Sequence, residues 1–84
     1  MDAPQVKPGD RVRIAAAVSA IVSKVYTDRP GFIEVVYLDA RNQAIVEDAE
    51  WKSGWAFAIE GPCGGYADKY SRLEQFVATL RHGL

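Results

Sequence analysis

The chain has 84 residues, of which 49% are apolar and 25% are charged. This length fits one domain with a single core and excludes a multilayer enzyme, while the apolar share excludes a largely disordered chain. Ten Lys and Arg against eleven Asp and Glu give a net charge of −1, which excludes a strong overall attraction to nucleic acid or to an anionic membrane.

Cysteine content and hydropathy indicate the compartment. Cys63 is the only cysteine in the sequence, so no intrachain disulfide can form, whereas secreted domains of this size usually carry several. No apolar run approaches the roughly 20 residues that a membrane-spanning helix requires. The polar N-terminus also lacks the apolar segment of a signal peptide. We therefore expect a cytoplasmic protein that does not associate with membranes.

The N-terminal third predicts an arm and two strands. Residues 1–8 contain two prolines and no periodicity, which is typical of a flexible arm, so that 9–84 form the single domain. Alternation over 11–14 predicts a first strand with Val12 and Ile14 on one face. The three alanines at 15–17 fit either an extension of this strand or a short loop. Residues 18–26 predict a central strand, and 27–31 predict a turn.

The dominant pattern is a long β-hairpin over residues 31–51. Its strands are predicted at 32–38 and 44–51, joined by a polar turn at 39–43. Glu34 would be costly in a core, so the face without it is taken as the core face, with Ile33, Val35 and Tyr37. The opposite face needs a cover, either the C-terminal helix or another subunit, for Phe32, Val36 and Leu38.

A further strand, a loop and one helix complete the chain. Residues 55–60 alternate large and small side chains, as in a half-buried strand, and the glycine-rich residues 61–65 predict an irregular loop. Residues 71–82 predict a helix in which Ser71 and Glu74 match a capping box, and Gly83 ends it. The apolar stripe of this helix is Leu73, Phe76, Val77 and Leu80, extended backwards by Tyr70.

Together these elements predict a mainly β (α+β) fold. We expect a small, strongly bent antiparallel five-stranded barrel, which closes to hide its strand edges, with one C-terminal amphipathic helix at about 71–82. The opening KPGDRV at 7–12, followed by short strands and a long hairpin, resembles small Src-homology-3-like barrels over residues 7–60. The chain length and the EGPCGGY segment at 60–66 look similar to proteins encoded on bacterial integron gene cassettes, which implies a bacterial cytoplasmic protein without an assigned activity.

The polar residues do not form a recognisable catalytic or metal-binding motif. Cys63 lies among glycines near a helix start, where a thiol pKa can be lowered, but a nucleophile also needs a base. The only histidine, His82, lies at the far end of the same helix, about 16 Å from its start. One Cys and one His do not make a metal site, and the glycines match no phosphate-binding fingerprint. We predict no catalytic residues, metal or cofactor.

Aromatic content provides the leading functional prediction. Nine aromatic residues exceed what one small core always hides, and aromatic groups at a barrel rim are typical of recognition surfaces and dimer interfaces. We predict a non-enzymatic binding module that recognises a protein or a small amphipathic ligand through rim aromatics and an acidic hairpin. The candidate binding residues are Trp51, Trp55, Tyr66, Tyr70, Glu47 and Glu50.

Two alternatives and one assembly prediction accompany this reading. The chain could bind nucleic acid through its basic N-terminal third, or it could be an oligomeric enzyme with a site shared between subunits. We also expect self-association. If the helix covers its own hairpin, the region of Trp51 and Trp55 is left for association; if it packs on a neighbour, the oligomer becomes necessary for folding. The basic residues of the first alternative are Lys7, Arg11, Arg13, Lys24 and Arg29.

Overall fold

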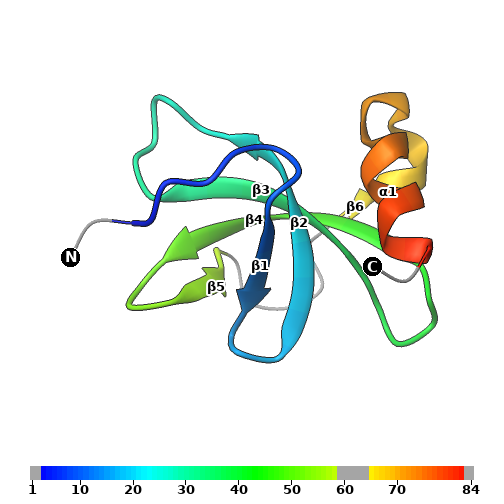
Figure 1. Cartoon of the computed structure of the whole chain (residues 1–84), viewed down its shortest axis with the longest axis horizontal. Helices are drawn as coiled ribbons and strands as arrows, with labels where there is room; N and C mark the ends of the chain where they lie inside the picture. The colour runs from blue at the N-terminus through cyan, green and yellow to red at the C-terminus, as the bar shows by residue number, and fades with distance from the viewer. Residues whose placement is uncertain (1–2, 59–64, 83–84) are drawn as a thin grey trace.

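The computed structural model describes residues 3–58 and 65–82 (Figure 1). Its strands are β1 Arg11–Ile14, β2 Val18–Val25, β3 Phe32–Leu38, β4 Ala44–Trp51, β5 Trp55–Phe57 and β6 Gly65–Tyr66. Two 3₁₀ turns, η1 Ala67–Lys69 and η2 Ser71–Leu73, lead into one helix, α1 Glu74–Arg81. Within the described residues, no helix has the length and apolar character that crossing a bilayer requires.

The first five strands form a closed barrel. Strands β1 to β5 pair as consecutive antiparallel neighbours, and a single parallel pair, Ile14 with Trp55, joins β1 to β5. The predicted mainly β fold with a small five-stranded barrel and one C-terminal helix is confirmed, and it is consistent with a Src-homology-3-like barrel. The barrel is mixed rather than wholly antiparallel, because its first and last strands run in the same direction where they meet.

The hairpin pattern predicts β3 and β4 residue by residue, and the turn between them has a clear physical cause. Asp39 Oδ1 accepts hydrogen bonds from the backbone N–H groups of Arg41 and Gln43, each at 2.9 Å. Asn42 adopts a φ of 62°, a conformation that Asn tolerates better than most residues. These local bonds reverse the chain and fix the register in which Phe32 faces Glu50.

The alanines between β1 and β2 form a turn, which resolves the choice that the sequence left open. Ala15 and Ala16 have φ values of 54° and 58°, in a left-handed region that costs about 1–2 kcal/mol per non-glycine residue. The Ala15 N–H donates to the Trp55 carbonyl at 2.8 Å, and the Ala17 N–H donates to the Ile14 carbonyl at 3.0 Å. The hydrogen bond that forms when the barrel closes therefore offsets the conformational free energy that this left-handed turn costs.

The core consists of two clusters on opposite faces of the sheet. Ile33 and Val35 lie in the inner cluster and Tyr37 packs at its edge, so the predicted core face of the hairpin is confirmed. The inner cluster as a whole comprises Ile14, Ala20, Val22, Ile33, Val35, Ala49 and Trp55. The N-terminal residues 3–8 have no regular secondary structure, and Ala3 and Val6 pack against this cluster.

The helix covers the outer face of its own hairpin. The buried residues of this second cluster are Val36, Ala44, Val46, Ala67, Leu73 and Val77. Leu38, Phe76 and Leu80 pack against them, so the predicted apolar stripe of the helix is the face that packs, except for its predicted extension Tyr70, which is 45% exposed. Phe32 lies outside this cluster, beneath the guanidinium of Arg29, whose Cζ is 4.1 Å from the ring centroid. Figure 1 shows α1 beside β6, well away from β5.

The start of the helix differs from the prediction. Helix α1 begins at Glu74, and neither it nor η2 has a side-chain cap hydrogen bond, so the predicted capping box of Ser71 and Glu74 is wrong. The extended residue before the helical turns is Tyr70, with φ −116° and ψ 113°, rather than Ser71. Residues 71–73 form a 3₁₀ turn instead, in which Leu73 is buried and Arg72 is ion-paired with Glu34.

Several predictions fall on segments that the structure does not describe. They are the end of the fifth strand at 59–60, Cys63 with most of the glycine-rich loop, and the stop at Gly83. Gly65, which the sequence places in that loop, instead begins β6 and pairs with Val46. Strand β6 extends the sheet beside the N-terminal half of β4 and leads directly into η1, which builds one wall of the groove described next.

Candidate functional site

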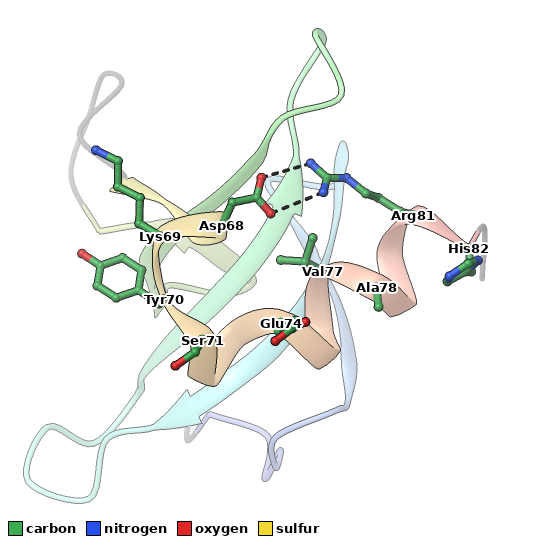
Figure 2. A pocket seen from close by; sticks show the side chains of 9 residues that line it. All are labelled: Asp68, Lys69, Tyr70, Ser71, Glu74, Val77, Ala78, Arg81 and His82. Carbon is green, nitrogen blue, oxygen red and sulfur yellow. Dashed lines mark hydrogen bonds and ion pairs between the residues drawn. The ribbon is translucent and has the colours of Figure 1, made fainter.

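An open groove lies between η1 and the outward face of α1 and encloses about 760 Å³ (Figure 2). Figure 2 shows its side chains coming from two short segments that face each other across the opening. One wall comes from residues 68–71 and the other from the polar side of the helix. The complete lining is Asp68, Lys69, Tyr70, Ser71, Glu74, Val77, Ala78, Arg81 and His82.

Two buried anchors hold the walls of this groove apart. Ala67 is fully buried in the outer cluster and fixes η1, whose turn is closed by the Tyr70 N–H donating to the Ala67 carbonyl at 3.0 Å. Val77, 5% exposed, fixes the helix against the same cluster and contributes the apolar floor. Ala78 follows it and is exposed, so that the small side chain leaves room in the groove.

An exposed ion pair bridges the two walls. The Arg81 guanidinium donates to both carboxylate oxygens of Asp68, at 3.3 and 3.2 Å, and also to the Asn42 carbonyl at 3.5 Å. The Arg81 and Asp68 side chains are 39% and 57% exposed. Because solvent screens such pairs, this one contributes about 0–1 kcal/mol to folding. Its charged groups can therefore exchange partners with a ligand at little cost.

Of the predicted residues, Tyr66 directly precedes η1 without lining the groove, and Tyr70 lines it. They are 49% and 45% exposed, and the Tyr70 hydroxyl lies over Gly65, 3.9 Å from where a Cβ there would stand. Lys69 Nζ lies 5.7 Å from the Tyr66 ring centroid, and a second cation, Arg72, lies 5.5 Å from that of Tyr70. Tyr70 gives the groove an aromatic wall with a polar tip.

The two predicted tryptophans lie elsewhere. Trp55 is 7% exposed and belongs to the inner core, which corrects the expectation that it projects from the barrel rim. The reason is barrel closure, because β5 pairs with both β1 and β4 and turns the Trp55 ring inward. Trp51 is partly buried and packs edge-on against Trp55, with centroids 5.2 Å apart. Its indole Nε1 is buried without a hydrogen-bond partner among the described residues.

The two predicted glutamates are also separated from the groove and from each other. Glu47 lies opposite Val35 on the inner face and accepts a hydrogen bond from the Tyr37 hydroxyl at 2.5 Å. Burial, together with this bond and the charge of Glu47, raises the pKa of Tyr37. Glu50 lies on the outer face, with its Oε1 3.5 Å from Lys52 Nζ. The six predicted residues therefore do not form a single site.

An ion pair between a buried carboxylate and a partly exposed guanidinium positions the groove's aromatic wall. Arg72 donates to both carboxylate oxygens of Glu34, at 2.7 and 3.1 Å, and the Ser23 hydroxyl donates to the same carboxylate at 2.8 Å. Glu34 is 8% exposed. Burial alone would raise its pKa, but the bonds from Arg72 and Ser23 outweigh burial and lower it. This pair ties η2 to β3 and so fixes Tyr70 next to the helix.

The groove includes residues that the sequence reading assigned no role. The sequence predicted no binding role for Asp68, Arg81 or His82. Glu74, Ala78 and Arg81 stand at i, i+4 and i+7, a spacing that places them on one side of a helix, next to its apolar stripe. The small side chain of Ala78 between the charged Glu74 and Arg81 was the feature of the sequence that could have indicated a groove on this side of the helix. The facing wall, from η1, has no comparable pattern.

The basic residues proposed for nucleic-acid binding are dispersed over the molecule. Lys7 Nζ lies 3.8 Å from Asp10, and Arg29 lies 3.8 Å from Asp48. Lys24 lies over the Tyr26 ring, 5.1 Å from its centroid. Asp48 also accepts a hydrogen bond from the Tyr26 hydroxyl at 2.7 Å, and burial with this bond raises the Tyr26 pKa to about 12. Of the five basic residues, Arg11 and Arg13 lie near each other, because both belong to β1.

Comparison of the chain with protein families, curated proteins and solved structures finds no match. Among the described residues, no group of three or more His, Cys, Asp or Glu side chains is arranged to hold a metal ion. Function therefore has to be argued from the shape and chemistry of the grooves.

Proposed function

We propose that this protein is a non-enzymatic binding module whose ligand site is the groove between η1 and α1. The observation that carries the proposal is the exposed Tyr70 ring beside a floor of Val77 and Ala78, with charged groups of both signs around it. The volume of about 760 Å³ falls within the range of small-molecule and peptide sites. The ligand class is a small amphipathic molecule or an amphipathic segment of a partner protein.

The charges of the groove favour a ligand that carries both signs or is polar without a net charge. Asp68 and Glu74 offset Lys69 and Arg81, so the lining attracts neither anions nor cations strongly. A ligand carboxylate can pair with Arg81 in place of Asp68, since the existing pair is exposed and weak. The apolar part of the ligand then packs against Tyr70 and the floor, where burial of apolar area supplies the affinity.

The test is a screen of amphipathic dipeptides and small aromatic acids by amide chemical-shift mapping on the labelled protein. A ligand of this site should move the signals of residues 68–71 and 78–82. Ala78→Arg fills the groove while keeping a good helix former, and it should weaken binding at least about tenfold. Gln75→Arg is the matched control, because Gln75 is an exposed residue of α1 that does not line this groove.

Three results would contradict the proposal. They are a screen without any saturable ligand, signal changes that map to another part of the surface, and equal affinities of the Ala78→Arg and Gln75→Arg variants. Neither alternative, nucleic-acid binding through dispersed basic residues nor an oligomeric enzyme, has an observation of comparable weight behind it. Binding of an oligonucleotide in a separate titration would support the first alternative, and turnover of a screened compound would support the second.

We infer separately that the chain self-associates. Because α1 covers its own hairpin, folding does not require a neighbour, and the region of Trp51 remains for association. The exposed aromatic rings of Tyr66 and Tyr70 add apolar area on another side. Sedimentation at high micromolar concentration should show a species heavier than the monomer, and a monomer under these conditions would end the proposal.

A cytoplasmic location and a bacterial integron-cassette origin are also proposals. They are supported by the single cysteine of the sequence, which suits a reducing compartment, and by the resemblance in length and in the segment at 60–66. Fractionation of bacteria that express the tagged chain should place it with cytosolic markers. Recovery in the membrane or periplasmic fraction would contradict the location.

A further inference from the structure

A second open pocket, of about 370 Å³, lies between the N-terminal arm, residues 3–8, and the connection from β2 to β3. Figure 1 shows the arm passing close to this connection before the chain enters β1. We call it the arm pocket, and it shares no lining residue with the groove between η1 and α1. The lining residues that decide its chemistry are Val6, Val25, Pro30, Gly31, Ile33 and Trp55.

The wall that β2 and β3 contribute is apolar and incompletely covered. Val25 stands directly opposite Ile33, a member of the inner cluster, so both side chains leave the sheet on the inner face. The pairing of β2 with β1 ends at Ile21, which is opposite Arg11, and so does not extend to Val25. Val25 is therefore 36% exposed, whereas Ile33 is 2% exposed. An apolar side chain on the core face of the sheet is left in contact with solvent at this pocket.

The opposite wall is the arm, which rests on the inner cluster through apolar contacts. Ala3 and Val6 pack against that cluster. Residues 3–6 make no hydrogen bond with another residue that the structure describes. The first hydrogen bond along the chain is at Lys7, whose backbone N–H donates to Asp10 Oδ2 at 3.0 Å. The arm before Lys7 can therefore shift to admit a ligand without breaking a hydrogen bond within the described chain.

The described residues that line the arm pocket include no charged side chain. The groove between η1 and α1, by contrast, is lined by charged groups of both signs. An ionised group placed against apolar walls loses hydration and gains no partner, so this pocket disfavours anions and cations alike. Its polar side chains are the exposed Gln5 amide and Tyr26, whose hydroxyl already donates to Asp48 at 2.7 Å. The lining therefore suits a ligand without a charge.

We propose that the arm pocket binds a small uncharged apolar molecule of one or two rings. Its volume exceeds the roughly 150 Å³ of a cavity that holds benzene, and it lies at the small end of the range for small-molecule sites. The ligand lies on Val25 and beside the Trp55 ring, and the arm closes over it through Val6. Burial of apolar area on both sides supplies the affinity. This ligand class and place are independent of the amphipathic ligand proposed for the other groove.

The experiment is a titration of the labelled protein with 2-naphthamide, followed by amide chemical shifts. Saturable changes should appear at Val6, Val25 and Ile33. The anion 2-naphthoate, which has the same rings, should bind at these positions about tenfold more weakly or worse. Val25→Glu should lose about tenfold or more in affinity for 2-naphthamide, because it places a charge in the apolar wall. Thr27→Glu is the matched control, since it adds the same charge at an exposed residue outside the lining and should bind as the unmodified protein does.

Four outcomes would overturn the proposal. They are no saturable change with 2-naphthamide, changes confined to residues 68–71 and 78–82, equal affinities of Val25→Glu and Thr27→Glu, and equal binding of 2-naphthoate in the arm pocket. The second would assign the compound to the groove between η1 and α1 instead. Val25→Thr, which exchanges one methyl group for a hydroxyl of similar shape, keeps the test decisive if Val25→Glu fails to fold. It should weaken 2-naphthamide binding by about threefold, and an unchanged affinity would count against the pocket.

Discussion

Removing the Arg72 guanidinium, which pairs with a buried carboxylate, should destabilise the fold more than removing that of Arg81, which pairs with an exposed one. In the native structure the Glu34 carboxylate is 8% exposed and accepts two bonds from Arg72 and one from Ser23. Arg72→Met keeps the length and apolar stem of the side chain but leaves this carboxylate with the hydrogen bond from the Ser23 hydroxyl alone among the described residues. The perturbation therefore isolates the cost of a buried charge that has lost its partner.

The loss in the free energy of unfolding depends on how far the Glu34 and Arg72 side chains are exposed to water. Breaking a fully buried pair costs about 3–5 kcal/mol, and a hydrogen bond to a charged group contributes about 1.5–3 kcal/mol. The Arg72 side chain is 53% exposed, so water screens the pair and can reach the carboxylate once the guanidinium is gone. We therefore expect a loss of about 2 kcal/mol in the free energy of unfolding for Arg72→Met, below the range for fully buried pairs.

The assay is urea unfolding followed by tryptophan fluorescence, which reports on Trp51 and Trp55 in the barrel. With a slope of about 1 kcal/mol per molar urea for a domain of this size, the midpoint should fall by about 2 M. Arg81→Met is the matched control, because Arg81 makes the same two-bonded contact with an aspartate, Asp68, that is 57% exposed. That variant should lose less than about 1 kcal/mol.

Acid provides a second test of the same pair. The pKa of Glu34 is lowered in the folded state, so its contribution is fully present above the unfolded pKa of about 4.3 and is lost as pH falls through the folded value. The stability gap between the unmodified protein and Arg72→Met should therefore be constant near neutral pH and close below about pH 4. Equal losses for Arg72→Met and Arg81→Met, or a gap that persists in acid, would refute the reasoning.

Three further predictions concern the core, the helix and the tyrosines. Trp55→Ala should cost about 3–5 kcal/mol and abolish the folded circular dichroism signal near 37 °C; a stable, folded variant would place the ring outside the core. Phe76→Asp should unfold the chain while the exposed Gln75→Asp does not, and a folded monomeric Phe76→Asp would show that the helix packs on a neighbour instead. Tyr26 and Tyr37 should stay protonated at about pH 11 in ultraviolet titrations, where exposed tyrosines ionise. Because folding raises these two pKa values, the stability that they contribute is fully present below the unfolded pKa of about 10 and is lost as pH rises through the folded values; ionisation of Tyr26 and Tyr37 near pH 10 would contradict this.

The elements themselves could be predicted from local patterns. The alternation of apolar side chains gave both hairpin strands at their observed ends, and the spacing of Leu73, Val77 and Leu80 gave the packing face of the helix. Both patterns follow from the geometry of a single element, since side chains repeat every two residues on a strand and every 3.6 on a helix. The sequence likewise excluded Glu34 from the inner core, which is confirmed.

The candidate sites could be predicted only in part. Tyr66 and Tyr70 were identified as surplus aromatics and are exposed, and Tyr70 lines a groove, whereas Trp55 is buried by its place in the closing strand. An aromatic residue at a strand end can face either way, and its environment depends on which strands meet there. The N-terminal arm was predicted, but the pocket beside it needs Ile33 and Trp55 from two other strands.

Tertiary structure alone decided how the elements meet. The sequence determined that there is a hairpin, a set of short strands and one amphipathic helix, because each carries its own periodicity. It did not determine that Glu34 pairs with Arg72, 38 residues away, or that Ile14 closes the barrel against Trp55. Such contacts join residues with no local relation, and their energy depends on burial that exists only after the chain has closed. The same closure holds Ala15 in a left-handed conformation that its own side chain disfavours.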